Sequence, residues 1–260
     1  MNASRLDYTF AVGQVRALEN KLIPRDVFLE SAEEKDFSSA LKLLFDAGTF
    51  LEEMGEIKDT HALDLFIAKE QEALLKSLSD LFLEKGIKSL IEEEYSLEKA
   101  LIKAKETGYS FLIDYVRHQI DLGNLKMLAR FKYLELTLER LESILVSGGF
   151  LQTDRILKYH GLSFSDINEG LKHSPYFEVW SNGMDALQED ETFVEMERGF
   201  EDFLMRYLRK ARYIVFGPEP VFTYALSKKR EFDLFRMVGV GKMNHLPADI
   251  LKNRISETYV

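Results

Sequence analysis

The stretch that predicts the fold class reads Phe216-Gly-Pro-Glu-Pro-Val-Phe-Thr-Tyr-Ala-Leu-Ser-Lys-Lys-Arg-Glu-Phe-Asp-Leu-Phe-Arg-Met-Val-Gly-Val-Gly-Lys-Met-Asn-His-Leu-Pro247. Glu219 and Pro220 suit the first turn of a helix, where a carboxylate meets the positive end of the helix dipole and a missing N–H costs nothing. An apolar face follows at Phe222, Leu226, Phe232 and Phe235. We expect Gly239 to Gly241 to end this helix and 244–247 to form a turn before a short final helix.

Helical patterns extend over the rest of the chain. The apolar residues from Leu125 to Leu145 recur at helical intervals, and we expect Gly148-Gly149 to end that helix. Further helices are expected over 5–22, over 61–85 with Asp59 or Thr60 as the cap and Gly86 as the stop, and over 191–214, with a loop marked by Pro175 and Asn182-Gly183. No run of strict apolar–polar alternation is long enough for a strand, so the sequence predicts an all-α, multi-helical fold.

Composition limits the classes of function. The 260 residues include five prolines and no cysteine, which excludes disulfides and thiolate chemistry. A net charge of −10 argues against a general nucleic-acid binder. Charged residues interrupt the N-terminal apolar stretch, so we expect no signal peptide, and no uncharged run is long enough to span a bilayer.

Charge is distributed unevenly along the chain. Residues 206–260 hold eleven Lys/Arg and five Asp/Glu, a net charge of +6, which leaves −16 for residues 1–205. One interpretation is that this basic segment folds back on the acidic body and neutralises it. The other is that its cations face an acidic partner surface or anionic headgroups. The residues selected as candidate partner contacts are Lys228, Lys229, Arg230 and Arg236.

Motifs for catalysis are largely absent. Gly239-Val-Gly-Lys242 is not a phosphate loop, because such a loop needs glycine at Arg236, Ser or Thr at Met243, and a preceding strand. Asp114, His118 and Asp121 lie at i, i+4 and i+7 of a helix, a spacing that a divalent metal ion can use if another helix supplies further ligands. Surface helices also show this spacing by chance.

Two segments of the chain align without gaps at an offset of 110 residues. Asp121–Lys132 matches Glu231–Lys242, with acid on acid, Lys126 on Arg236 and Met127 on Met237. A weaker third copy includes Leu18. If the three copies are equivalent, Leu18, Leu128 and Val238 should occupy corresponding positions in three helices, and all three should be mostly buried.

The C-terminal stretch resembles one family, the C subunit of V-type and archaeal A-type ATPases, called d in eukaryotes. The matching residues are Phe216, Gly217, Glu219, Pro220, Tyr224, Lys228, Glu231, Arg236, Gly241, Lys242, Asn244 and Pro247. Tyr8–Leu22 is similar to the family's opening helix, and Asp121–Lys132 followed by Gly148-Gly149 is similar to its middle. This chain is shorter than most family members, so some of the usual helices are expected to be trimmed.

The resemblance implies both an architecture and a role. It implies three pseudo-repeated helical segments (1–95, 96–190 and 191–260) arranged as a funnel around a central hollow. The role is that of a non-catalytic rotor-coupling subunit on the cytoplasmic side of the membrane. Its partners are the central-stalk subunits and the membrane proteolipid ring, and it transmits torque between them without a cofactor, a nucleic acid or a small-molecule substrate.

Two other functions stay open on the residues alone. One is a soluble helical enzyme that uses a metal ion at Asp114, His118 and Asp121. The other is a helical adaptor unrelated to ATPases. The sequence does not distinguish proton from sodium coupling, nor pumping from synthesis, because the ion ligands of a rotary ATPase lie in the ring.

Overall fold

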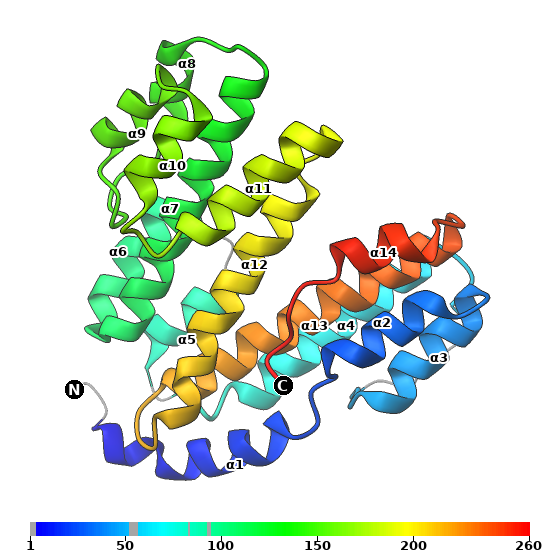
Figure 1. Ribbon diagram of the computed structural model, residues 1–260. Coiled ribbons are helices and arrows are strands. Elements are labelled where there is room, and N and C mark those ends of the chain that lie inside the picture. Colours follow the sequence, from blue (N-terminus) through cyan, green and yellow to red (C-terminus); the bar gives the residue numbers. More distant parts are fainter. Residues whose placement is uncertain (1–3, 52–56, 83, 93–94) are drawn as a thin grey trace. The chain divides into compact units, whose positions relative to one another are not determined.

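Every secondary-structure element in the described part of the chain is helical, as a computed structural model of the protein shows (Figure 1). The structure describes residues 4–51, 57–82, 84–92 and 95–260. The chain forms two compact units, unit 1 (Met1–Glu93 with Met205–Val260) and unit 2 (Glu94–Leu204). The all-α prediction is therefore confirmed for the described residues. The division into 1–95, 96–190 and 191–260 and the funnel around a central hollow stay predictions.

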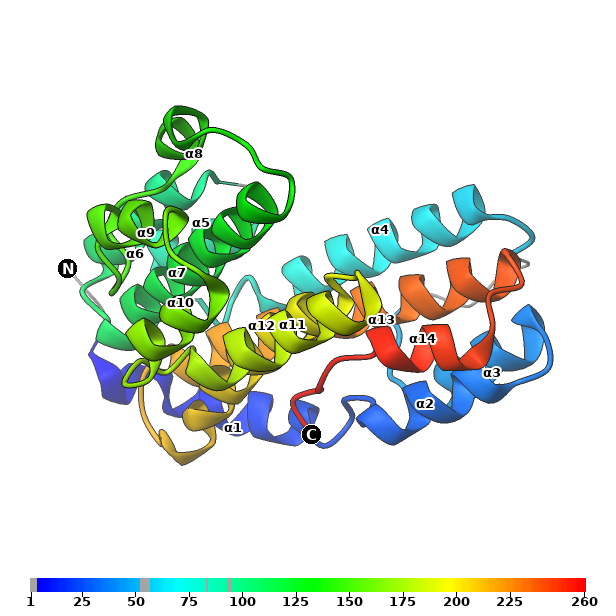
Figure 2. The same cartoon turned by 45° about the horizontal axis from the view of Figure 1, so that its top comes forward.

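Helix α13 (Glu219–Met243) is the central element of unit 1. It packs against α4, α3, α1, α2 and α14, and Figures 1 and 2 both show it running between α2 and α4. The other elements of unit 1 are η1 (Arg5–Tyr8), α1 (Thr9–Glu19), α2 (Arg25–Glu33), α3 (Phe37–Ala47), α4 (Thr60–Leu78), α5 (Lys85–Glu92), η2 (Lys210–Tyr213) and α14 (Ala248–Arg254). The ring of Phe235 of α13 packs at a tilt against those of Phe50 and Phe66, with ring centroids 5.3 and 5.9 Å apart, so aromatic packing joins α13 to the N-terminal half of the chain.

Helix α7 (Ser110–Tyr133) holds the equivalent place in unit 2. It packs against α6 (Leu97–Thr107), α8 (Leu138–Ile144) and α9 (Thr153–His160). The other helices of this unit are α10 (Phe164–Leu171), α11 (Phe177–Asp190) and α12 (Val194–Arg209), the last of which ends in unit 1. Leu125, Leu128 and Trp180 are completely buried in the core of this unit. Trp180 is therefore a packing residue, as its surroundings of leucine, isoleucine and methionine require.

The start of α13 agrees with the sequence prediction, but its end does not. Pro218 is the N-cap and a proline follows in the first turn, whereas the helix continues through Gly239 and Gly241 as far as Met243. A Cβ at Gly239 would lie 2.7 Å from Leu63, and one at Gly241 would overlap Leu251. These glycines therefore let α4 and α14 approach α13 closely. A buried glycine inside a helix reads in sequence like a helix end.

Asn182-Gly183 was expected to mark a loop, and this prediction is wrong, since both residues lie inside α11. A Cβ at Gly183 would lie 2.6 Å from the Cβ of Met196, so glycine is needed where α11 and α12 pack together. Packing between helices here outweighs the turn preference of the Asn-Gly pair.

The apolar stripe from Leu125 to Leu145 crosses a turn instead of following one helix. Helix α7 ends at Tyr133 and α8 begins at Leu138, because Glu135 adopts a left-handed conformation with φ of 52°. His245 between α13 and α14 has φ of 55°, and it follows Glu135 at the offset of 110 residues. The two long helices thus end in the same kind of turn, and each turn leads to a helix of seven residues.

The helix expected over 61–85 is divided in two. Asp59 is its N-cap, as predicted, and its side chain accepts a hydrogen bond of 2.7 Å from the N–H of Ala62. Helix α4 ends at Leu78, and Gly86, which was expected to stop it, lies in the first turn of α5. Leu81 and Phe82 are both buried in the segment between α4 and α5. In a continuous helix their side chains would point about 100° apart, so the break lets both of them reach the core.

Candidate functional site

The candidate site is α13 with the segments that it holds, because the motif that suggested a function lies there. Gly217 precedes the helix with φ of 114°, a left-handed conformation that glycine adopts without strain. Glu219 in the first turn is buried and accepts two hydrogen bonds from the Arg5 guanidinium, at 2.8 and 3.1 Å. A further bond of 2.7 Å joins Arg5 to the carbonyl of Phe216. One arginine therefore fixes the N-terminal segment to the start of α13.

A buried ion pair lies in the middle of α13. Lys228 and Glu231 are 4% and 3% exposed, and the Lys228 ammonium donates to the Glu231 carboxylate. Lys228 also donates to the carbonyl of Thr49 at 2.9 Å, and Glu231 accepts from the N–H of Ile23 at 2.8 Å. Burial raises the pKa of Glu231, and Lys228 opposes that shift. The pair joins two N-terminal loops to the C-terminal helix.

The other three candidate partner contacts also have bonds within unit 1. Lys229 donates to the carbonyl of Ile91, and Arg230 donates to the Ser256 hydroxyl at 3.0 and 2.7 Å. Arg236 pairs with Asp64 at 2.7 Å, and its side chain is 51% exposed. The Arg236–Asp64 pair agrees with the interpretation that the basic segment folds back on the acidic body, whereas Arg230 bonds within the basic segment. Contact with another protein stays a prediction for all four residues.

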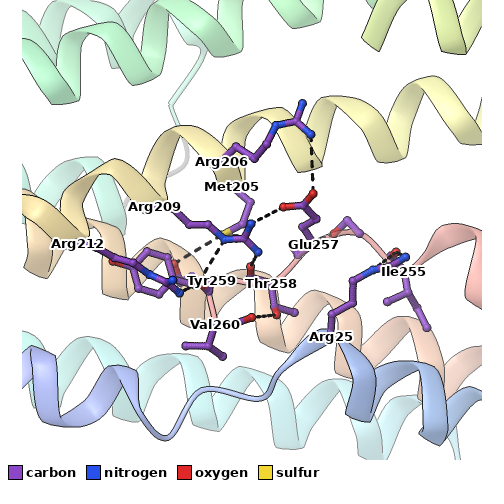
Figure 3. Close-up of polar contacts among 12 residues, drawn as sticks. Arg25, Met205, Arg206, Arg209, Arg212, Ile255, Glu257, Thr258, Tyr259 and Val260 are labelled. Carbon is purple, nitrogen blue, oxygen red and sulfur yellow. Dashed lines mark hydrogen bonds and ion pairs between the residues drawn. The ribbon is translucent and has the colours of Figure 1, made fainter. Parts of the chain in front are cut away.

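A second set of arginines holds the C-terminal segment 255–260, which has no regular secondary structure (Figure 3). Arg209 donates to the carbonyls of Thr258 and Tyr259 and pairs with Glu257 at 2.5 Å. Arg212 donates to the carbonyl of Tyr259, and Arg25 of α2 donates to that of Ile255 at 3.2 Å. Sequence reasoning missed this arrangement. The excess of Lys and Arg over 206–260 was its only signal.

An open groove of 360 Å³ lies beside the buried ion pair, between α1, α4 and α13. Leu18 lines this groove and is only partly buried, whereas Leu128 and Val238 are completely buried. All three side chains are thus at least mostly buried, as predicted, while the equivalence of the three positions stays a prediction. The exposed side of α1 at this point faces the groove instead of a core.

The three residues considered as metal ligands have separate roles in unit 2. Asp121 accepts hydrogen bonds from Phe150 N–H (2.8 Å), Leu151 N–H (3.0 Å) and the Tyr176 hydroxyl (2.7 Å). His118 Nδ1 lies 2.7 Å from the same hydroxyl, and Asp114 pairs loosely with an arginine at 3.9 Å. Over the ranges that the structure covers, no three His, Cys, Asp or Glu side chains gather as a metal site would require.

Buried polar bonding accounts for His118 and Asp121, whereas Asp114 is partly exposed. Burial raises the pKa of Asp121, while the bonds from Tyr176 and the two backbone N–H groups lower it part of the way. The carboxylate holds the loop at 150–151 against α7. Asp121 stood out in the sequence, but its hydrogen bonds could not be predicted, because no pattern around Tyr176 indicates that it bonds to Asp121.

Gly239–Lys242 lies within α13, so it has none of the strand–loop–helix geometry that a phosphate loop requires. The Lys242 amine donates to the carbonyl of Glu34 at 2.5 Å, close to the end of α2. No helix in the described ranges is both long and apolar enough to cross a bilayer.

The site therefore defines a class of helical protein whose central helix is built for packing and ion pairing. A family model described as ATP synthase (C/AC39) subunit matches residues 50–254, most of the chain. The chain belongs to this family. Membership fits a non-catalytic subunit, and it accounts for the motif in α13 noted in the sequence.

The chain is similar to the C subunits of several rotary ATPases. It is 24% identical over 155 residues to the C subunit of the V-type sodium ATPase of Enterococcus hirae, covering 60% of this chain and 47% of that protein. It is 24% identical over 162 residues to the C subunit of the A-type ATP synthase of Archaeoglobus fulgidus, covering 62% and 46%. With that of Methanocaldococcus jannaschii it shares 20% identity over 255 residues, covering 96% and 58%. The chain spans about half the length of the curated relatives it matches.

Proposed function

We propose that this chain is a non-catalytic coupling subunit of a V-type or A-type rotary ATPase. In this proposal it connects the central stalk to the membrane proteolipid ring on the cytoplasmic side and transmits torque between them. The observation that carries the proposal is the family match over residues 50–254, which includes the whole of α13. The names of the relatives, all of them C subunits of such ATPases, support it.

The bonding around α13 suits a part that must resist shear. Three polar ties join residues far apart in sequence within unit 1: Arg5 to Glu219, Ile23 to Glu231, and Arg25 to Ile255. These hydrogen bonds lie at different points along unit 1, so a force applied to one end of the chain is shared among several helices and does not detach a single one. A protein that only presents a binding face does not need this closure.

Basic side chains on α13 are the proposed contacts with the ring or stalk. Lys228 is almost completely buried, so its part in assembly is to keep the fold intact. Arg236 is the candidate best placed for direct contact, because half of its side chain is exposed. Exposed pairs contribute about 0–1 kcal/mol each, so several charges must act together, and binding must weaken with salt.

Co-purification tests the proposal. The tagged chain should be expressed in its native organism and isolated from gently solubilised membranes. We expect it to co-purify with the catalytic-head, stalk and ring subunits of a rotary ATPase. Their absence under conditions that keep the ATPase itself intact would contradict the proposal. Recovery of an unrelated complex would favour the helical adaptor.

A charge exchange tests the role of Arg236 separately. The double variant Arg236→Asp with Asp64→Arg keeps the ion pair but moves the cation from α13 to α4. If Arg236 contacts a partner, the double variant should fold normally and co-purify less ATPase than the wild type does. If the only role of Arg236 is to pair with Asp64, the double variant should assemble normally, whereas Arg236→Asp alone should not.

A further inference from the structure

Five large apolar side chains are exposed to solvent in unit 1, in the region where η1 and the start of α1 meet the segment before α13. They are Leu6, Phe10, Tyr213, Val215 and Phe216, here called the apolar patch. Tyr213 is 88% exposed and Phe10 is 72% exposed. Single exposed apolar residues are ordinary, whereas a group of them marks an interaction surface.

Two arginines bring the two halves of the apolar patch together. Arg5 donates to the carbonyl of Phe216, and Arg16 donates to the carbonyls of Ala211 and Ile214 at 2.6 and 3.0 Å. Both views in Figures 1 and 2 show the segment before α13 running along α1. Because these bonds use the backbone of the segment, its side chains at 213, 215 and 216 are left in solvent.

Exposed cations lie next to the apolar patch, although the chain as a whole is acidic. Of the four cations in residues 4–10 and 209–218, Arg5 pairs with Glu219 and Arg209 with Glu257, whereas Lys210 and Arg212 are exposed beside the segment that carries Tyr213, Val215 and Phe216. Lys210 lies 4.8 Å from the ring centre of Tyr207. Apolar and aromatic side chains bordered by cations are typical of surfaces that enter the interface of an anionic bilayer.

We propose that the apolar patch binds the surface of a bilayer that contains anionic lipid. Its side chains would lie at the level of the headgroups, with Lys210 and Arg212 close to the phosphates. A protein partner at the same patch is the alternative outcome that the experiment below distinguishes. This binding does not depend on membership of an ATPase complex.

Vesicle binding of the purified chain tests the proposal. The wild type should sediment with vesicles of phosphatidylcholine and phosphatidylglycerol in equal parts, bind phosphatidylcholine alone weakly, and lose binding as salt increases. Lys210→Glu changes the local charge by two and should weaken binding by about 30-fold, at about 1 kcal/mol for each charge. The triple variant Tyr213→Ser, Val215→Ser, Phe216→Ser should bind at least about tenfold more weakly.

The matched control is Leu65→Ser, which removes an apolar side chain that is half exposed on α4, away from the apolar patch. It should bind as the wild type does. Circular dichroism should show that all variants keep their helices, so that lost binding does not reflect unfolding.

A labelled cysteine gives a direct readout, because the chain contains no cysteine of its own. With an environment-sensitive fluorophore on Val215→Cys, anionic vesicles should shift the emission to the blue, and the same fluorophore on Leu65→Cys should not respond. No binding of the wild type at low salt, or an equal response at both labels, would overturn the proposal. The proposal would also be overturned if the wild type did not bind vesicles and the triple variant failed to assemble with ATPase subunits, since the apolar patch would then bind a protein.

Discussion

Asp121 of unit 2 and Glu231 of unit 1 lie 110 residues apart on matched helices, and both are buried carboxylates that accept backbone N–H bonds. Asp121 holds Phe150 and Leu151, which follow it by 29 and 30 residues. Glu231 holds Ile23, which is 208 residues away. Unit 2 is thus closed by a local loop and unit 1 by the two ends of the chain.

The difference between the two carboxylates shows how the same helix can be fixed in two ways. The further partner of Glu231 is an ammonium group, Lys228, whereas that of Asp121 is a neutral hydroxyl, Tyr176. Closing unit 1 requires contacts between distant parts of the sequence, so its folding loses more loop-closure entropy before those contacts form. Each prediction below separates the behaviour of one unit from that of the other.

The largest expected effect is that of Glu231→Gln. The substitution leaves the Lys228 ammonium buried without its counter-charge, which should lower the free energy of unfolding by about 3–5 kcal/mol in urea titrations. The control is Lys228→Met with Glu231→Leu, which removes both charges and should cost less than Glu231→Gln alone. A double variant that is the less stable of the two would show that the pair itself stabilises unit 1.

Leu128→Ala should have the next largest effect. Leu128 is completely buried in the core of unit 2, and truncating a buried leucine costs about 2–5 kcal/mol. Leu138→Ala, at a position 42% exposed in the same unit, should cost less than about 0.5 kcal/mol. Thermal or urea unfolding measures both. Equal losses for the two leucines would contradict the assignment of the core.

Asp121→Asn should cost less than Glu231→Gln, about 1–3 kcal/mol at neutral pH. No buried cation loses its partner, but the amide nitrogen of asparagine is a donor, and it would replace one of two oxygens that both accept bonds. Hydrogen exchange should show faster exchange of the Phe150 and Leu151 amides than in the wild type. Unchanged exchange there would mean that the carboxylate does not hold the loop.

The smallest effect is expected at Glu197 in unit 2. It pairs with Lys126, the residue matched to Arg236, at 2.9 Å and with Arg130 at 2.6 Å. Burial alone would raise the pKa of Glu197, but the two cations hold it below the ordinary 4.5. Because these groups are about one third exposed, Glu197→Gln should cost about 0–1 kcal/mol at pH 7.

The contribution of Glu197 should depend on pH in a defined direction. A carboxyl with a lowered pKa in the folded state stabilises the protein above its unfolded-state pKa, near 4.5. The difference in stability between wild type and Glu197→Gln should therefore be full at neutral pH and disappear as the pH falls through the lowered pKa. A difference that grows on acidification would show that the ion pairs have been misassigned.

Much of the fold could be predicted because it depends on local signals. The apolar face of α13, its proline at the first turn and the cap at Asp59 are read directly from neighbouring residues. The interior glycines at 183, 239 and 241 could not be placed correctly, since their reason is a neighbouring helix that comes close only in the folded chain. The same limit applied to the site: α13 was recognised from its motif, but Lys228 bonds to Thr49 and Glu231 bonds to Ile23, residues that are distant in sequence.

Coupling itself gives the most direct test of the proposed function. Membrane vesicles from cells that lack this chain should be compared with vesicles to which the purified wild type has been added, measuring ATP hydrolysis and ion transport together. We expect that hydrolysis continues without the chain, that transport per ATP hydrolysed falls sharply, and that adding the chain back restores it. Unchanged transport per ATP without the chain would contradict the coupling role.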